Sequence, residues 1–305
     1  MTNTPLKLGA YAAGLAVAFA ATFAVGTAFG PVTKEVDAES TSAHSETGGH
    51  GTGHDTGHGE AASASSAGLA MSDRGYTFQP AATTAQASAN TPFRFTVTGP
   101  DGHPVTEYQR RHEKELHLIV VRRDLAAFQH VHPTPDASGV WTVPLDLGRA
   151  GSYRVFADFA PAALDGDTLT LGADLSVAGR FTPAPLAPPA DTATVDGYEV
   201  TLDGTPTAAQ ESELTFTVRR GGREVTDLQP HLGAYGHLVS LRAGDLAYLH
   251  THPATEAHPG ERGGPRVLFG TTFPTAGTYR LFLDFRHDDT VRTAEFTVVV
   301  PGVHT

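Results

Sequence analysis

The sequence predicts an all-β protein in which two tandem β-sandwiches follow an apolar N-terminal helix and a histidine-rich tether. Three observations support this fold class. The chain contains many short runs of β-branched and aromatic residues, helical periodicity is confined to its start, and its second half repeats its first. The composition also narrows the function: a net charge of −12 disfavours a nucleic-acid partner, and the absence of cysteine excludes disulfides and thiolate metal sites.

The N-terminus predicts a membrane segment. Residues 8–32 contain no charged side chain, and this length exceeds both the roughly 20 apolar residues that cross a bilayer and the core of a usual cleaved signal. We therefore expect a single-pass transmembrane signal-anchor, with a cleaved signal as the alternative, because the stretch is rich in alanine and glycine. In both cases the folded part lies outside the cytoplasm, tethered to the cell membrane or secreted.

Two breaks delimit the folded modules. Residues 33–75 hold almost no large apolar side chain, which predicts a flexible tether, and the Pro/Ala-rich stretch at 182–192 predicts a stiff linker. The modules are therefore expected at 76–181 and 193–305. The tether is suited either to weak capture of divalent ions or to a plain spacer role, and its histidines are His44, His50, His54 and His58.

The two modules are copies of one another. AGSYRVFADF at 150–159 matches AGTYRLFLDF at 276–285 at an offset of 126, and the second copy carries about six extra residues around EAHPGERGG. Ordered matches of this kind indicate an internal duplication. At an offset of 120 and without a gap, His117, Arg122, His130, His132 and Pro133 correspond to His237, Arg242, His250, His252 and Pro253.

Each copy consists of short β-prone runs separated by Gly, Pro and Asp. Examples are PFRFTVTG, LHLIVV, VWTVPLDL and YRVFADF in the first module, and ELTFTVRR, GHLVSLR, VLFGTTF and YRLFLDF in the second. About seven such strands in about 100 residues are typical of a β-sandwich.

The Gly-x-Tyr entry into YRVFADF and YRLFLDF resembles the tyrosine corner of immunoglobulin-like domains, with Tyr153 and Tyr279 as the corner tyrosines. Val155 and Leu281 stand where antibody domains place a cysteine. The general plan is similar to small exported bacterial immunoglobulin-like domains, the YtkA-like family and the copper-resistance CopC-like proteins. This resemblance implies an immunoglobulin-like sandwich and a metal role. The histidine at the mature N-terminus that ligates copper in CopC-like proteins has no equivalent here.

Each module carries three histidines that a hairpin would bring together. In ELHLIVVRRDLAAFQHVHP, a turn at residues 123–124 places His117 opposite His130. Residues two apart share one face of a strand, so His132 joins them. The second module repeats the arrangement with His237, His250 and His252.

An apolar stripe continues the same face of each hairpin. It comprises Ile119, Val121 and Phe128 in the first copy, and Val239, Leu241 and Tyr248 in the second. We expect this stripe to face the core of its own sandwich, which would leave two separate metal sites at the two rims. Imidazole ligands without sulfur point to Cu(II) or Zn(II). The alternative is a set of half-buried histidines that hydrogen-bond to carbonyls.

Further candidates lie outside the triads. Asp158 and Asp284 follow the corner tyrosines by five residues, and strict alternation sends them to the face opposite the core-facing histidines. From there they either reach the site through a bulge, orient a ligand, or are solvated strand carboxylates. His258, in the insertion of the second copy, is a candidate fourth ligand of that copy. His112 and His231 do not align but are further candidates. We expect His103, His287 and His304 at the surface.

These features favour a membrane-tethered, extracytoplasmic protein that binds divalent metal for capture, buffering or delivery, with a metal transporter or acceptor protein as a partner. Two alternatives remain at this point. One is an immunoglobulin-like adhesion or scaffolding protein of the cell envelope with structural histidines, and the other is a metal-dependent hydrolase. No catalytic motif such as GxSxG, HExxH or a P-loop occurs, so an enzyme is not the expected class.

Overall fold

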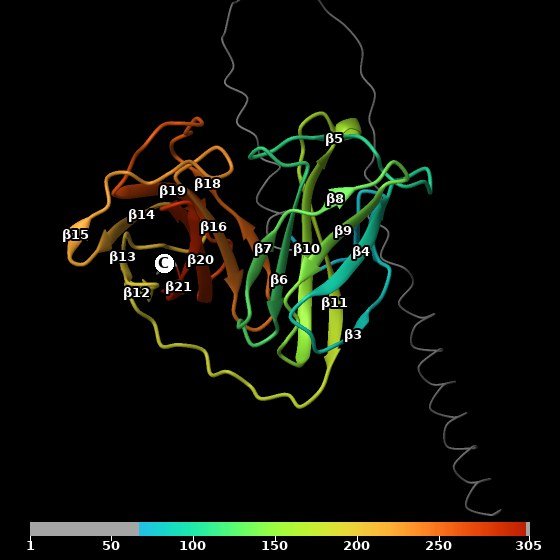
Figure 1. The fold of residues 1–305 in the computed structure, drawn as a ribbon, viewed down its shortest axis with the longest axis horizontal. Helices are drawn as coiled ribbons and strands as arrows, with labels where there is room; N and C mark the ends of the chain where they lie inside the picture. Colours follow the sequence, from blue (N-terminus) through green and yellow to red (C-terminus); the bar gives the residue numbers. More distant parts are fainter. Residues whose placement is uncertain (1–66, 303–305) are drawn as a thin grey trace, which may run out of the picture. The chain divides into compact units, whose positions relative to one another are not determined.

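The computed structural model describes residues 67–302, which fold into two β-sandwich modules joined by an extended linker (Figure 1). The predicted transmembrane helix and most of the predicted tether lie outside the described residues. Within residues 67–302, no helix is long and apolar enough to cross a membrane. The prediction of an all-β, duplicated fold is confirmed, because strands and one short 3-10 helix, η1 (Ala162–Leu164), make up the regular structure of this range.

The first module contains two sheets. One has the order β1 (Ser72–Asp73), β2 (Tyr76–Pro80), β4 (Thr91–Thr98), β9 (Val140–Leu145) and β8 (Thr134–Pro135). The other has the order β3 (Thr84–Gln86), β11 (Leu169–Ala178), β10 (Gly151–Pro161), β6 (Leu116–Arg122) and β7 (Gln129–Val131), with β5 (Tyr108–Gln109) paired to β10.

The second module repeats this plan. Its first sheet has the order β12 (Thr192–Val195), β13 (Tyr198–Asp203), β14 (Glu211–Arg220), β19 (Arg266–Thr272) and β18 (His252–Pro253), with β15 (Arg223–Glu224) paired to β14. Its second sheet has the order β17 (Tyr248–His250), β16 (Gly236–Arg242), β20 (Gly277–His287) and β21 (Thr290–Val300).

Both modules have the tyrosine corner expected of an immunoglobulin-like sandwich. The Tyr153 hydroxyl donates to the carbonyl of Arg149 at 2.6 Å, and the Tyr279 hydroxyl donates to the carbonyl of Thr275 at 2.9 Å. Each tyrosine is at most 1% exposed and packs in the apolar core between the two sheets of its module.

A third apolar cluster joins the two modules. Its members come from β6, the β6–β7 turn and β10 in the first module, and from β16, the β16–β17 turn, β17 and β20 in the second. They are Ile119, Val121, Leu125, Phe156, Val239, Leu241, Leu246, Tyr248 and Phe282, with Phe128 packed against them. Our expectation that the stripe faces the core of its own sandwich is therefore wrong. The intervening residues Leu118 and Val120 fill that core, so β6 is buried on both faces.

The hairpin register also differs from the prediction. His130 lies opposite Ile119, not His117, and His250 lies opposite Val239, not His237. The turn closes with hydrogen bonds between Arg122 and both Leu125 and Ala126, and Leu125 has a left-handed backbone with φ of 63°. Moving the centre of the turn by one residue shifts each partner by two, so the histidines keep a common face.

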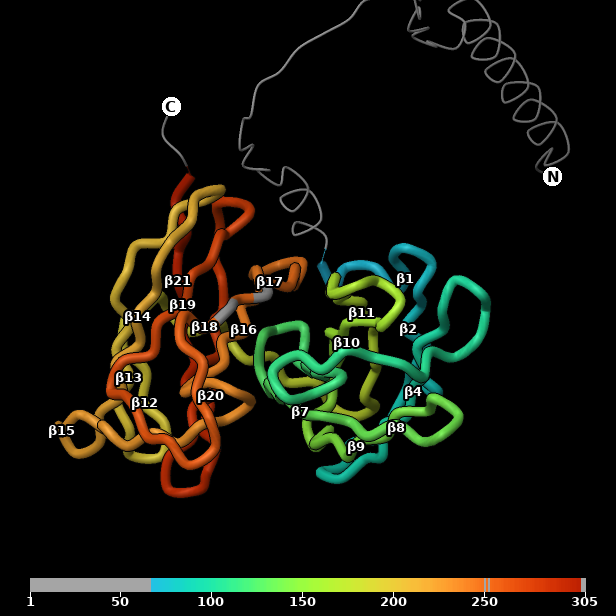
Figure 2. Tube along the Cα trace, turned by 90° about the horizontal axis from the view of Figure 1, so that it is seen from above, coloured from blue at the N-terminus to red at the C-terminus, as the bar shows by residue number. Residues whose placement is uncertain are grey.

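The start of the described chain lies at the seam between the modules. The Gly68 N–H donates to Thr170 of the first module, and the Tyr248 N–H of the second module donates to Ala67. The Arg154 guanidinium donates to the carbonyls of Gly68 and Leu69. In Figure 2 this segment enters beside β17 and leads into β1. Residues 67–69 therefore contact both modules.

Candidate metal centre

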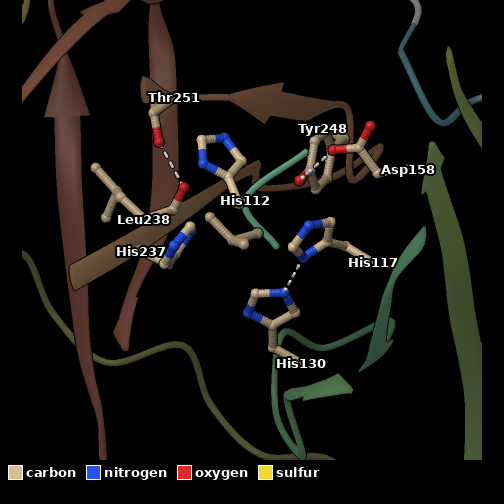
Figure 3. Close-up of a pocket in the computed structure, with 9 residues that line it drawn as sticks. His112, His117, His130, Asp158, His237, Leu238, Tyr248 and Thr251 are labelled. Atoms are coloured by element: carbon tan, nitrogen blue, oxygen red, sulfur yellow. Dashed lines mark hydrogen bonds between the residues drawn. The ribbon is translucent and has the colours of Figure 1, made fainter. Parts of the chain in front are cut away.

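Three histidines of the first module converge at the seam. Nδ1 of His117 lies 3.1 Å from Nε2 of His130 and 3.1 Å from Nε2 of His132. The three ligand atoms lie within 4.8 Å of one another. Two nitrogens at about 2.0–2.1 Å from one tetrahedral ion are about 3.3 Å apart, so the spacing fits a single ion. Figure 3 shows His117 and His130 pointing toward one another.

The partners of these rings fix which nitrogen is protonated. Nε2 of His117 contacts the carbonyl of Arg111 at 3.0 Å, and a carbonyl only accepts, so this nitrogen carries the proton and Nδ1 carries the lone pair. Nδ1 of His130 donates to Oδ2 of Asp284 at 2.8 Å, so its Nε2 is the nitrogen that faces His117. The lone pair on Nδ1 of His117 can therefore accept a proton from Nε2 of His130 or ligate a metal ion between the two rings.

Three more histidines surround the triad, two of them from the second module. The ring of His237 lies 5.0 Å from that of His112 and 6.3 Å from that of His117, measured between centroids. The ring of His231 lies 6.5 Å from that of His132. His112 and His231, which failed to align in the repeat, therefore each approach a histidine of the opposite module.

Both candidate aspartates lie on the same face as the histidines, because this face is turned away from the core of each sandwich and not toward it as we expected. Asp158 lies opposite His117 on the β10–β6 ladder, and Asp284 lies opposite His237 on the β20–β16 ladder. They are 3% and 4% exposed. Asp284 accepts from Thr293 at 2.6 Å in addition to His130, and Asp158 accepts from the Tyr248 hydroxyl at 3.1 Å. Asp284 thus orients the His130 ring across the interface.

Burial favours the neutral form of four of these rings. Desolvation, reinforced by neighbouring histidines, lowers the pKa of His117 to about 4 and the pKa values of His132 and His237 to about 2. Desolvation also lowers the pKa of His231. Metal ligation needs neutral imidazole, so these rings are in the ligating form at neutral pH.

The remaining candidates have different environments. The structure describes the backbones of His250 in β17 and His252 in β18, but not their side chains. His258 is exposed, and its N–H donates to Glu261. His103 is exposed as expected, and His304 lies outside the described range. Our expectation that His287 lies at the surface is wrong, because this residue is 8% exposed and hydrogen-bonds to Tyr198 and Asp227.

Sequence reasoning missed two residues of the pocket and its position between the modules. Besides four histidines, Asp158, Val239 and Tyr248, the pocket is lined by Leu238 and Thr251, and the Thr251 hydroxyl donates to the Leu238 carbonyl (Figure 3). The sequence LHLIVV could have indicated the position of the pocket. It is apolar on both faces apart from His117, and such a strand is usually buried on both faces.

The comparisons place the chain in a family. A family model described as Domain of unknown function (DUF8832) matches residues 70–179 and again residues 193–302. The chain therefore belongs to this family and carries its domain twice. Among curated proteins, no match is found.

Solved structures with a similar plan include bacterial adhesins. FdeC of Escherichia coli is 18% identical with a TM-score of 0.26, over 77% of this chain and 66% of that one. Yersinia pseudotuberculosis InvE is 14% identical with a TM-score of 0.24, over 74% of this chain and 58% of that one. Yersinia pseudotuberculosis InvD is 13% identical with a TM-score of 0.25, over 76% of this chain and 59% of that one. This chain spans less than two thirds of each. Similarity at this level carries no functional argument.

Proposed function

We propose that this protein binds a divalent transition-metal ion, Cu(II) or Zn(II), with His117, His130 and His132 as ligands. The observation that carries the proposal is the convergence of Nδ1 of His117 with Nε2 of His130 and of His132, at 3.1 Å each, inside a buried site. Imidazole is a ligand common to both ions, and the Irving–Williams order favours Cu(II) where both compete.

The surroundings support a binding role. The Arg111 carbonyl accepts from His117, and the Asp284 carboxylate accepts from His130, each at the ring nitrogen that does not face the other histidines. Metal-bound histidines usually have such a partner at their second ring nitrogen. Asp284 is 4% exposed, and a buried carboxylate is stabilised when a cation lies nearby. We propose that the site acts in capture, buffering or delivery, outside the cytoplasm and tethered by residues 8–32, with a transporter or acceptor protein as partner.

Metal titration of the full chain tests this proposal. We would strip the protein with a chelator, add Cu(II) or Zn(II) alone, and count the ions retained after desalting. The background variant H44A/H50A/H54A/H58A removes the N-terminal histidines. We expect retained metal in this background, at least tenfold weaker affinity after H130A, and no change after H258A, because His258 is exposed. Equal binding with and without H130A would contradict the proposal.

The second candidate is an immunoglobulin-like adhesion or scaffolding protein of the cell envelope. The observation in its favour is the apolar cluster that fixes the two modules against each other, since a scaffold needs a stable relationship between its domains. In this case the histidines are structural, and the titration finds no tight metal. A hydrolase would instead show turnover that chelation abolishes.

A further inference from the structure

The second module presents a histidine that copies the position of a triad ligand. His237 pairs with Asp284 on its ladder as His117 pairs with Asp158. Nε2 of His237 contacts the carbonyl of Leu232 at 3.0 Å, as Nε2 of His117 contacts that of Arg111. The same tautomer follows, so Nδ1 of His237 carries a lone pair.

This lone pair lies at the pocket. His237 is 7% exposed and lines the pocket together with His112, His117, His130 and Asp158 (Figure 3). Nδ1 is therefore the nitrogen through which His237 can ligate an ion at the pocket.

Ring separations distinguish two ion positions. Within the triad, the ring centroids are 5.3, 4.9 and 4.8 Å apart. His237 and His112 have the same separation, 5.0 Å. His237 is farther from the triad, at 6.3 Å from both His117 and His130. His237 and His112 therefore fit one ion together, but His237 does not fit the ion of the triad.

We propose that a second divalent ion occupies this pocket, held by His237 of the second module and His112 of the first, so that the centre is dinuclear. Asp158 lines the same pocket and supplies negative charge beside this position. The backbone register supports a duplicated centre, because His250 lies opposite Val239 as His130 lies opposite Ile119. Binding at this position is coordination by imidazole and involves no redox step.

This inference rests on the proposed function and adds the number of bound ions and their closeness to one another. Two-metal sites in proteins hold their ions about 3.5–4 Å apart, and the His237 ring, 6.3 Å from the rings of His117 and His130, is near enough for a close pair of this kind. Two Cu(II) ions at such a distance couple magnetically, whereas Cu(II) ions at two separate module rims would not.

The experiment uses the full chain in the H44A/H50A/H54A/H58A background, titrated with Cu(II) alone and examined by metal analysis and EPR spectroscopy. We expect two retained ions per chain with a dipolar-coupled spectrum. H237A should leave one ion with the spectrum of isolated Cu(II), whereas H130A should weaken the triad ion. H112A provides a second test, because His112 is only half-buried and its removal should destabilise the fold less than removal of the buried His237. H258A is the matched control and should retain both ions.

The outcomes separate the two claims. One retained ion that H130A removes, with H237A and H112A unchanged, overturns the dinuclear centre and leaves the proposed function standing. Two uncoupled ions also overturn it. No retained ion overturns the proposed function itself. Near-ultraviolet circular dichroism of Trp141, which is buried in the first module, verifies that each variant is folded.

Discussion

Asp284 of the second module hydrogen-bonds His130 of the first, with Oδ2 of the carboxylate 2.8 Å from Nδ1 of the ring. The carboxylate holds the orientation of His130, so its effect on the proposed metal site would be indirect. Removing such an outer partner typically lowers metal affinity about 10–100-fold. We expect D284N to weaken binding by this factor in competition with a chelator of known affinity. D203N, an exposed aspartate on β13, is the control, and equal affinities of D284N and D203N would contradict the role of Asp284.

Acid should destabilise the metal-free protein. The unperturbed pKa of histidine is about 6.5, and in the folded protein burial lowers it to about 4 for His117 and about 2 for His132 and His237. Between these values and 6.5, the unfolded chain binds more protons than the folded chain, so the free energy of unfolding decreases as pH falls. The slope is about 1.4 kcal/mol per pH unit for each such histidine.

Urea unfolding at pH 7.5, 6.0 and 5.0 measures this slope. H237N removes one of the three rings and should make the slope shallower, whatever its effect on stability at neutral pH. A free energy of unfolding that stays constant over this range would show that the rings are not buried in neutral form.

The seam should depend on Gly68. A Cβ at this position would clash with the ring of Phe156, and Gly68 has a positive φ of 72°. We expect G68A to reduce the free energy of unfolding by about 1–3 kcal/mol and to expose the segment to protease. Gly102 is the matched control, because its φ is 80° and a Cβ there would meet nothing within 4 Å. If G68A and G102A cost the same, only the backbone conformation matters and not the seam.

The two tyrosine corners should contribute similarly. Y153F and Y279F each remove a hydroxyl that donates to a carbonyl, of Arg149 and Thr275 respectively. Each change should lower the free energy of unfolding by about 1 kcal/mol, the usual net value of a buried hydrogen bond. Thermal unfolding of the single and double variants measures this, and additive effects are expected because the corners lie in different modules. An unaffected melting temperature in either variant would argue against its corner as a stabilising bond.

The sequence was sufficient for the fold because local and repeated patterns encode it. The Gly-x-Tyr blocks predicted both tyrosine corners, and the fixed spacing of His117, His130 and His132 predicted a shared face. That face survived the error in register, because a shift of two residues preserves the side of the strand.

The location of the site was not predictable in the same way. An apolar stripe such as Ile119 and Val121 looks identical whether it faces its own sandwich or another module. The contacts of His112 with His237 and of His130 with Asp284 depend on packing between residues more than 120 positions apart. No local pattern encodes such a pairing.

The interface also bears on how a duplicated chain arises. Phe128 stacks on Phe282 at 3.9 Å, and Tyr248 lies 5.6 Å from Phe156. Phe128 corresponds to Tyr248 in the repeat and Phe156 to Phe282, so each module gives the other the same pair of contacts. A single ancestral module with this apolar face would bury it by forming a two-fold homodimer, whose population depends on protein concentration. Fusing the two copies makes the encounter intramolecular, so the assembly no longer depends on dilution. Once the copies share one chain, each is also free to change separately, as the insertion around His258 already shows.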